Sequence, residues 1–281
     1  MLIGHKTAIK DLKRLADERK LVHGYVFFGP RMVGKRTLAL NLANYLEGNG
    51  FSLPKLLIDA TVIEPDENGT IGIDAIRDLK QFLWQRPNLS LYRTAIINDA
   101  ELLTTEAQNA LLRIAEEPPP STLLILITSD PGGLAPTLSS RLQKIYFSTV
   151  PQELIEGWLI KELSQDKKTA RNIAARSFGK PGLAAAIISD KKFQELLKSA
   201  ENLLKLPAAK RRDFLKKLLI KDDFSFTKFL DALIIHISSV SIHNAEKIKE
   251  WHNLLRLRHE AAYFNLNPRL QLEALFMRNN Y

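Results

Sequence analysis

Apolar residues follow two different spacings in the first half of the chain. Short, almost uniformly apolar runs of the length of buried strands lie at residues 25–28, 55–59, 92–99 and 123–128. Between them, apolar residues recur every three to four positions, as on one face of a helix, at residues 5–20, 35–46, 73–86 and 105–115. This alternation predicts a doubly wound α/β domain with a parallel sheet, whose ligand loops follow the carboxyl ends of the strands.

The second half of the chain shows helical spacing throughout. A first group of helices is predicted near residues 152–163, 167–178 and 181–189. A second group is predicted near residues 191–204, 207–220, 225–241, 243–263 and 267–277. The pattern therefore predicts three parts: an α/β domain over residues 1–148, a small helical domain over 149–190 and an all-α domain over 191–281.

Composition narrows the class of protein. The 281 residues are 45% hydrophobic and 25% charged, which is typical of a globular domain in water. No apolar run approaches the roughly 20 residues of a membrane-spanning helix, and the N-terminus lacks the layout of a signal peptide. We therefore expect a cytoplasmic protein with no membrane partner. The absence of cysteine excludes disulfides and thiolate metal sites, and His252 and His259 have no third ligand near them in the sequence, so no metal-ligand cluster is expected.

Positive charge is concentrated in the last third of the chain. The net charge is +9, and residues 191–281 carry 17 Lys and Arg against 10 Asp and Glu. This excess of positive charge is compatible with a nucleic-acid or acidic-protein partner, but an ordinary solvated helical surface is the simpler interpretation. The charge alone does not choose between them.

A glycine-bounded loop joins the first predicted strand to the next helix. Its residues are Gly29, Pro30, Arg31, Met32, Val33, Gly34 and Lys35, followed by Arg36 and Thr37. In this context backbone N–H groups and the helix N-terminus bind phosphate, and the lysine reaches the terminal phosphates. A serine or threonine should come next to hold Mg²⁺, but Arg36 stands there, and Thr37 is about 100° further round the helix. We expect a nucleotide site with a weakened hold on ATP and Mg²⁺; the alternative is a turn that binds nothing.

Two other strand ends carry candidate site residues. Asp99 ends the run at 92–99, where nucleotide hydrolases of this architecture place the acid that holds Mg²⁺. Thr128 ends the most apolar run and is a candidate sensor of the γ-phosphate. The alternative for Asp99 is an ordinary acid that begins a turn.

Four short motifs resemble a known family. They are Leu21-Val22-His23-Gly24, Asn109-Ala110-Leu111-Leu112-Arg113, Glu116-Glu117-Pro118 and Leu138-Ser139-Ser140-Arg141-Leu142-Gln143. Together with Asp99 they resemble the AAA+ clamp-loader subunits of bacterial DNA polymerase III, strongly over residues 1–147 and more loosely to about 190. The resemblance implies an AAA+ P-loop fold, a helical lid over 149–190 and an all-α collar over 191–281 that joins the subunits in a ring.

The same resemblance implies a role for Arg141. In clamp loaders the arginine of the Ser-Arg pair reaches the γ-phosphate of ATP bound to a neighbouring subunit. A guanidinium suits this role, since it is permanently charged and forks two bonds to phosphate. The implied partners are motor and δ subunits in a hetero-oligomeric ring, and through the ring the sliding clamp and primer-template DNA.

Three departures from the family bear on ATP hydrolysis. Position 36 is arginine, the catalytic glutamate position is Ala100, with Glu101 one residue late, and the lid residues 178–183 contain no arginine. The four-cysteine zinc module common in the family is also absent, so no zinc is expected. The resemblance therefore favours a stator-like subunit that assists clamp loading without its own turnover.

Two other functions stay open at the level of sequence. One is an active AAA+ ATPase, a motor subunit or helicase-loader relative, in which Thr37 or Arg36 and Glu101 replace the missing groups. The other is a small P-loop kinase, against which the helical collar and the Ser-Arg motif speak.

Overall fold

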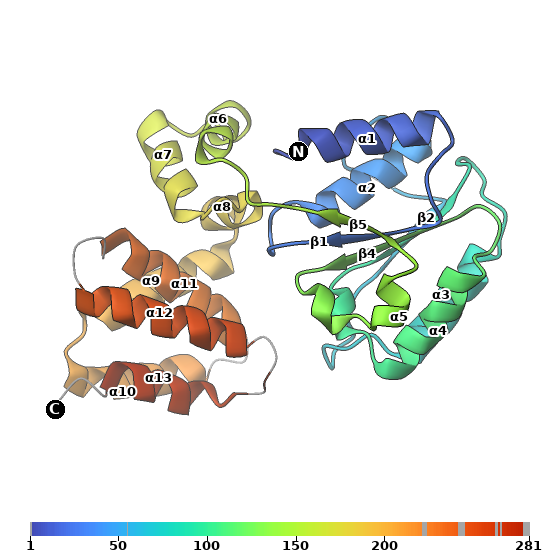
Figure 1. The fold of residues 1–281 in the computed structure, drawn as a ribbon. Coiled ribbons are helices and arrows are strands. Elements are labelled where there is room, and N and C mark those ends of the chain that lie inside the picture. Colours follow the sequence, from blue (N-terminus) through green and yellow to red (C-terminus); the bar gives the residue numbers. More distant parts are fainter. Residues whose placement is uncertain are drawn as a thin grey trace. The chain divides into compact units, whose positions relative to one another are not determined.

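A five-stranded, all-parallel sheet forms the centre of the N-terminal half (Figure 1). Its strands lie in the order β2-β3-β4-β1-β5. Their bounds are β1 (Gly24–Phe28), β2 (Ala60–Ile63), β3 (Arg93–Ile97), β4 (Thr122–Thr128) and β5 (Gln143–Tyr146). The computed structural model describes residues 2–54, 56–220, 224–240, 245–261, 264 and 266–277.

Helices cover both faces of this sheet. On one face lie α1 (Lys6–Asp17) and α2 (Lys35–Leu46), and on the other α3 (Ile73–Leu83), α4 (Thr105–Glu116) and the short α5 (Pro136–Ser139), as Figure 1 shows. Because successive side chains of a strand point to opposite faces, β4 contributes to two cores. Leu124 and Leu126 belong to the core under α3 and α4, whereas Leu123, Ile125 and Ile127 belong to the core under α1 and α2. The predicted doubly wound α/β fold is confirmed.

The second predicted strand is wrong in position. The apolar run at 55–59 predicts a strand there, but β2 is Ala60–Ile63, and Lys55 lies outside the described residues. The backbone N–H groups of Ile58 and Asp59 donate to the carboxylate of Glu47, at 3.0 and 2.8 Å, instead of to a neighbouring strand. Asp59 bonds to β3 through its carbonyl, which accepts the N–H of Thr94 at 2.8 Å, and the register with β3 begins at Ala60.

The remaining elements are helical. They are the 3₁₀ turns η1 (Ala100–Leu102) and η2 (Pro131–Gly133), and the helices α6 (Gln152–Leu163), α7 (Lys167–Arg176), α8 (Pro181–Ser189), α9 (Lys191–Lys205), α10 (Ala208–Leu219), α11 (Phe226–Val240), α12 (Ala245–Glu260) and α13 (Pro268–Met277). These bounds follow the helical spacing of the sequence closely, although part of the predicted helix at 243–263 lies outside the described residues.

Contacts divide the chain into two units. One comprises Met1–Ala170 with Phe178–Gly182, and the other Arg171–Ser177 with Leu183–Tyr281. In the second unit α11 packs against α9 and α12, and α10 packs against α13. The three-part domain division stays a prediction. Among the described residues, no helix combines the length and apolar character that a membrane span requires.

Candidate nucleotide-binding site

Three strand ends meet at the carboxyl edge of the sheet. The last residue of β1, Phe28, is the ladder partner of Thr128 in β4, and Ile97 of β3 is the partner of Leu126. The loops that follow these strands therefore lie together, as expected for a ligand site in an open α/β sheet. The loop at 29–35, Asp99 and Glu101, and Ser129 all come from this edge.

The glycine-bounded loop has the backbone conformation that its glycines permit. Gly29 has a φ of 136°, and a Cβ there would lie 2.2 Å from the carbonyl oxygen of Phe147. Gly34 has a φ of 114° and precedes the first turn of α2, which has no side-chain cap. The carbonyl of Met32 accepts a bond from the N–H of Gly182 at 2.9 Å. The loop therefore ends at an uncapped helix N-terminus, which suits an anion, and it is fastened to the start of α8.

Lys35 is buried within this loop. The residue is only 6% exposed, and its ammonium donates to the carbonyls of Gly29 and Pro30 at 2.6 and 2.7 Å. Burial lowers the pKa of Lys35 to about 8, although the nearby charge of Glu101 opposes this change. Two of the three N–H donors of the ammonium are therefore bonded by the loop itself, and the third is available for a phosphate oxygen.

Arg31 extends from the loop to the other two strand ends. Its guanidinium lies 3.3 Å from the hydroxyl of Ser129, 3.4 Å from Oε1 of Glu101 and 3.7 Å from Oδ1 of Asp99. Glu101 also accepts the Ser129 hydroxyl at 2.5 Å, and its side chain is only 7% exposed. The site thus contains two cations, Arg31 and Lys35, and two carboxylates.

The two carboxylates respond to this environment in opposite ways. Burial raises the pKa of Asp99, and the charge of Arg31 only partly opposes that effect. Burial would also raise the pKa of Glu101, but hydrogen bonds from Ser129 and the charge of Arg31 hold that pKa below its usual value. Glu101 is therefore a weak base, while its other oxygen, Oε2, is buried without a hydrogen-bond partner.

The two residues at the predicted metal position, Arg36 and Thr37, lie on the first turn of α2. Arg36 is exposed and points to Glu64, with 2.7 Å between their charged atoms, and Thr37 is half-buried on α2. Thr128 donates its hydroxyl to the carbonyl of Asp130 at 2.8 Å, so this hydroxyl is bonded within its own turn. The roles predicted for these residues toward nucleotide stay predictions.

The residues of the site fit a phosphate group better than a magnesium ion. The uncapped helix N-terminus and Lys35 are suitable for phosphate oxygens. The two carboxylates that could hold Mg²⁺ are instead paired with Arg31. No cluster of three or more His, Cys, Asp or Glu suited to a metal occurs in the described parts of the chain.

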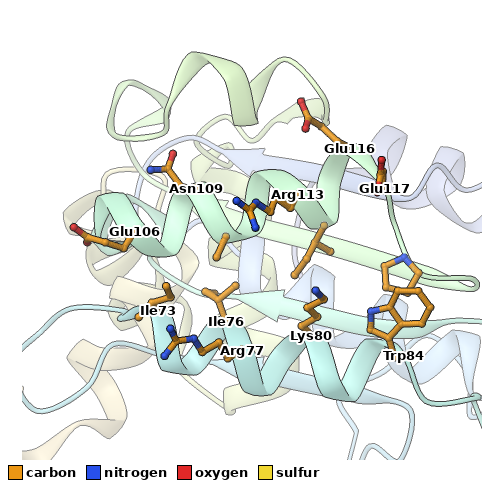
Figure 2. Close-up of a pocket in the computed structure, with 13 residues that line it drawn as sticks. Ile73, Ile76, Arg77, Lys80, Trp84, Glu106, Asn109, Arg113, Glu116 and Glu117 are labelled. Carbon is orange, nitrogen blue, oxygen red and sulfur yellow. The ribbon is translucent and has the colours of Figure 1, made fainter.

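Arg141 lies away from this site. It follows α5, its side chain is 56% exposed, and it forms an ion pair with Glu116 at 3.2 Å. Glu116 is the last residue of α4 and also lines a groove of about 750 Å³ between α3 and α4. Figure 2 shows Lys80 and Trp84 from the α3 side of this groove and Arg113 from α4. Sequence analysis missed the groove, because it is formed between two helices and the exposure of Trp84, 61% at the end of α3, is a property of the folded chain.

Sequence analysis also missed Ser129, whose hydroxyl bonds to Glu101 and Arg31 in the site. This residue directly follows β4, so its position was available from the strand prediction. Its bonds to Glu101 and Arg31 join segments 28 and 98 residues apart, and no local pattern marks them.

Comparison with known proteins gives consistent matches. The family described as "DNA polymerase III, delta subunit" matches residues 54–151. The chain is 32% identical over 137 residues to DNA polymerase III subunit delta′ of Escherichia coli K12, covering 48% of this chain and 41% of that protein. It is 28% identical over 179 residues to subunit gamma/tau of Mycobacterium tuberculosis H37Rv, covering 59% of this chain and 31% of that protein. The chain thus spans well under half the length of these two relatives.

Similarity of structure extends over nearly the whole chain. The structure of a DNA polymerase III gamma-subunit-related protein from Thermotoga maritima matches with a TM-score of 0.63 at 24% identity, covering 96% of this chain and 97% of that one. At this identity the match concerns the fold alone. The chain is thus similar in sequence to DNA polymerase III subunits delta′ and gamma/tau over part of its length, and similar in fold to the gamma-subunit-related protein.

Proposed function

We propose that this chain is the delta′-type, stator-like subunit of a DNA polymerase III clamp loader. It assembles with motor and δ subunits in a hetero-oligomeric ring and assists the ATP-driven loading of a sliding clamp onto primer-template DNA. The match to subunit delta′ of E. coli and the all-helical C-terminal segment support this assignment.

One observation carries the proposal: Arg31 of the glycine-bounded loop is bound within the chain's own site, whereas Arg141 of the Ser-Arg pair is exposed at the surface. Arg31 is taken up by the carboxylates of the chain's own site, at 3.4 and 3.7 Å. The Arg141 side chain is 56% exposed and forms a surface ion pair with Glu116, which is worth at most about 1 kcal/mol. Arg141 can therefore leave Glu116 for a phosphate of another subunit at little cost, whereas the chain's own site has little capacity left for Mg²⁺–ATP.

A second function, that of an active ATPase, is favoured by the convergence of Lys35, Asp99 and Glu101 at one edge of the sheet. The similarity to gamma/tau subunits also favours this second function. Against it, the pKa of Glu101 is lowered and its Oε1 is bonded to Ser129 and Arg31, so this carboxylate is a poor base for an attacking water.

The test measures ATP hydrolysis and clamp loading by the purified protein, alone and mixed with the motor and δ subunits, clamp and primed DNA of its own organism. Wild type is compared with Arg141→Ala and Arg141→Lys. Arg14→Ala is the matched control, because Arg14 is also exposed (60%) and in a surface ion pair, with Asp11 at 3.6 Å.

We expect the lone chain to be silent and Arg141→Ala to slow the assembled complex without preventing its assembly. At the one site that Arg141 serves, the loss should reach about 10³-fold or more, as for arginine fingers in related phosphoryl transfers. Arg141→Lys should restore little, since an ammonium does not fork two bonds, and Arg14→Ala should match wild type. Turnover by the lone chain that Lys35→Ala abolishes would instead establish the active ATPase.

A further inference from the structure

Arg31 has a position in the nucleotide site that neither the family resemblance nor the proposed function explains. It is the third residue of the glycine-bounded loop, and its guanidinium reaches oxygens that follow two different strands. These oxygens are Oδ1 of Asp99 and Oε1 of Glu101 after β3, and the hydroxyl of Ser129 after β4. One side chain therefore ties together three of the loops that form the site.

The oxygens around Arg31 are those of a divalent-cation site. Carboxylate and hydroxyl oxygens are the ligands that Mg²⁺ prefers in proteins, usually one or two carboxylates with water and phosphate. A second observation also indicates a cation here: Glu101 is 93% buried, and its Oε2 has no hydrogen-bond partner. A buried carboxylate is costly unless a positive charge compensates it, and in this chain the compensating charge is a guanidinium.

We propose that Arg31 is a built-in replacement for the divalent ion, and that it keeps Mg²⁺ and Mg²⁺–nucleotide out of this site. A metal ion would need its ligands at about 2.1 Å, which leaves no room for a guanidinium bonded to the same oxygens. The arginine is attached to the loop, so its effective concentration at the carboxylates is in the millimolar range or above, which competes with free Mg²⁺. The inference deepens the proposed function. It rests on that function in one respect, namely that this site does not hydrolyse ATP.

Arg36 provides a contrast within the same loop and helix. The sequence places Arg36 at the metal-ligand position, and its side chain is about as exposed as that of Arg31 (51% against 47%), but it pairs with Glu64 at 2.7 Å and not with the site carboxylates. Loss of Arg36 therefore leaves the carboxylates of Asp99 and Glu101 with their cation. Loss of Arg31 leaves them with the nearby charge of Lys35, whose ammonium is bonded to the carbonyls of Gly29 and Pro30 instead.

The experiment is thermal unfolding of the full chain in EDTA and in millimolar Mg²⁺, with the metal alone as the probe. The variants are Arg31→Ala, the neutral but hydrogen-bonding Arg31→Gln, and the control Arg36→Ala. We expect Mg²⁺ to leave the melting temperature of wild type and Arg36→Ala unchanged. The two Arg31 variants should melt on the order of 3–6 °C lower in EDTA and recover at least half of that loss in Mg²⁺.

Two further measurements locate the effect. The double variant Arg31→Gln/Asp99→Asn should lose the recovery, because one of the two carboxylates is neutral. Electron paramagnetic resonance of Mn²⁺ should show bound metal with Arg31→Gln and none with wild type.

The proposal is overturned if Mg²⁺ or Mg²⁺–ADP raises the melting temperature of wild type, since the site would then accept metal with Arg31 present. It is also overturned if neither Arg31 variant responds to Mg²⁺ or binds Mn²⁺, or if the response survives Asp99→Asn. None of these measurements needs a partner subunit or ATP turnover. Failure of this inference therefore leaves the role of Arg141 untouched, and failure of the Arg141 experiment leaves this result standing.

Discussion

Asp59, just before β2, carries a carboxylate whose removal should strongly destabilise the N-terminal unit. The residue is 1% exposed, and its two oxygens accept the N–H groups of Asn88, Leu89 and Ser90 at 2.7, 2.5 and 2.8 Å. The guanidinium of Arg93 lies 3.2 Å away and its side chain is only 6% exposed. The change Asp59→Ala would therefore leave three backbone donors and one buried cation without this acceptor.

The magnitude follows from what remains for Arg93. Removing one partner of a buried ion pair costs about 3–5 kcal/mol. Arg93 keeps the carbonyls of Ile58 and Arg86, each at 3.0 Å, and lies over the ring of Phe82. These contacts stabilise the guanidinium, so we expect the lower end of that range, about 3 kcal/mol, for Asp59→Ala. Asp59→Asn keeps part of the hydrogen bonding and should cost less.

The effect should also depend on pH. Burial would raise the pKa of Asp59, but the three backbone donors and Arg93 outweigh burial and hold that pKa below its usual value. Because the folded-state pKa is below the unfolded value of about 3.9, the contribution of the carboxylate is complete above that value. It is lost as the pH falls through the folded-state pKa, so wild type and Asp59→Asn should converge in stability in strong acid.

Urea unfolding followed by circular dichroism, at pH 7 and at steps down to pH 3, measures both effects. Asp74→Asn is the matched control, since Asp74 also pairs with an arginine, Arg77 at 2.6 Å, but its side chain is 86% exposed. That change should cost less than about 1 kcal/mol. Equal losses for Asp59→Asn and Asp74→Asn, or a loss at Asp59 that ignores pH, would refute the reasoning.

Two further predictions concern the phosphate loop and the C-terminal helices. Burial lowers the pKa of Lys35 to about 8, so between pH 8 and about 10.4 the unfolded chain binds a proton that the folded chain does not. The stability of wild type should therefore rise with pH across that window, by about 3 kcal/mol relative to Lys35→Met. Parallel pH profiles of stability for the two proteins would contradict this. Asp231→Ala breaks a forked pair with Arg258, at 2.8 and 3.2 Å, that links α11 to α12. Because both side chains are partly exposed, this change should cost about 1–2 kcal/mol by urea unfolding. Glu201→Ala, which removes an exposed i,i+4 pair with Lys205, should cost clearly less.

Local pattern was enough to predict most of the fold. The uniformly apolar run at 123–128 is β4, buried on both faces, and the glycine spacing before Lys35 correctly marks the loop between β1 and α2. These features depend on neighbours in the sequence, through the period of the apolar residues and the turn that glycine permits. The bounds of the helices could be predicted for the same reason, since the period of the apolar residues marks where each helix begins and ends.

Pattern failed where a distant residue decides the outcome. The run at 55–59 has the composition of a strand, but Glu47 takes its amides, and no spacing rule connects these segments. The site shows the same limit: Arg36 has the position in the motif, while Arg31 has the contacts. Which of two nearby arginines pairs with Asp99 and Glu101 depends on where β3 ends in the folded sheet, and therefore not on the local sequence.

The pairing of Arg31 and Lys35 with Asp99 and Glu101 has a consequence for how ligands arrive. Two cations and two carboxylates lie within one small volume, so their fields largely cancel a few ångströms away. Diffusing anions are drawn into clefts by uncompensated charge of one sign, and this attraction is what salt weakens. The charged side chains of this site supply little such net charge, so the rate at which it captures a polyphosphate should depend only weakly on ionic strength.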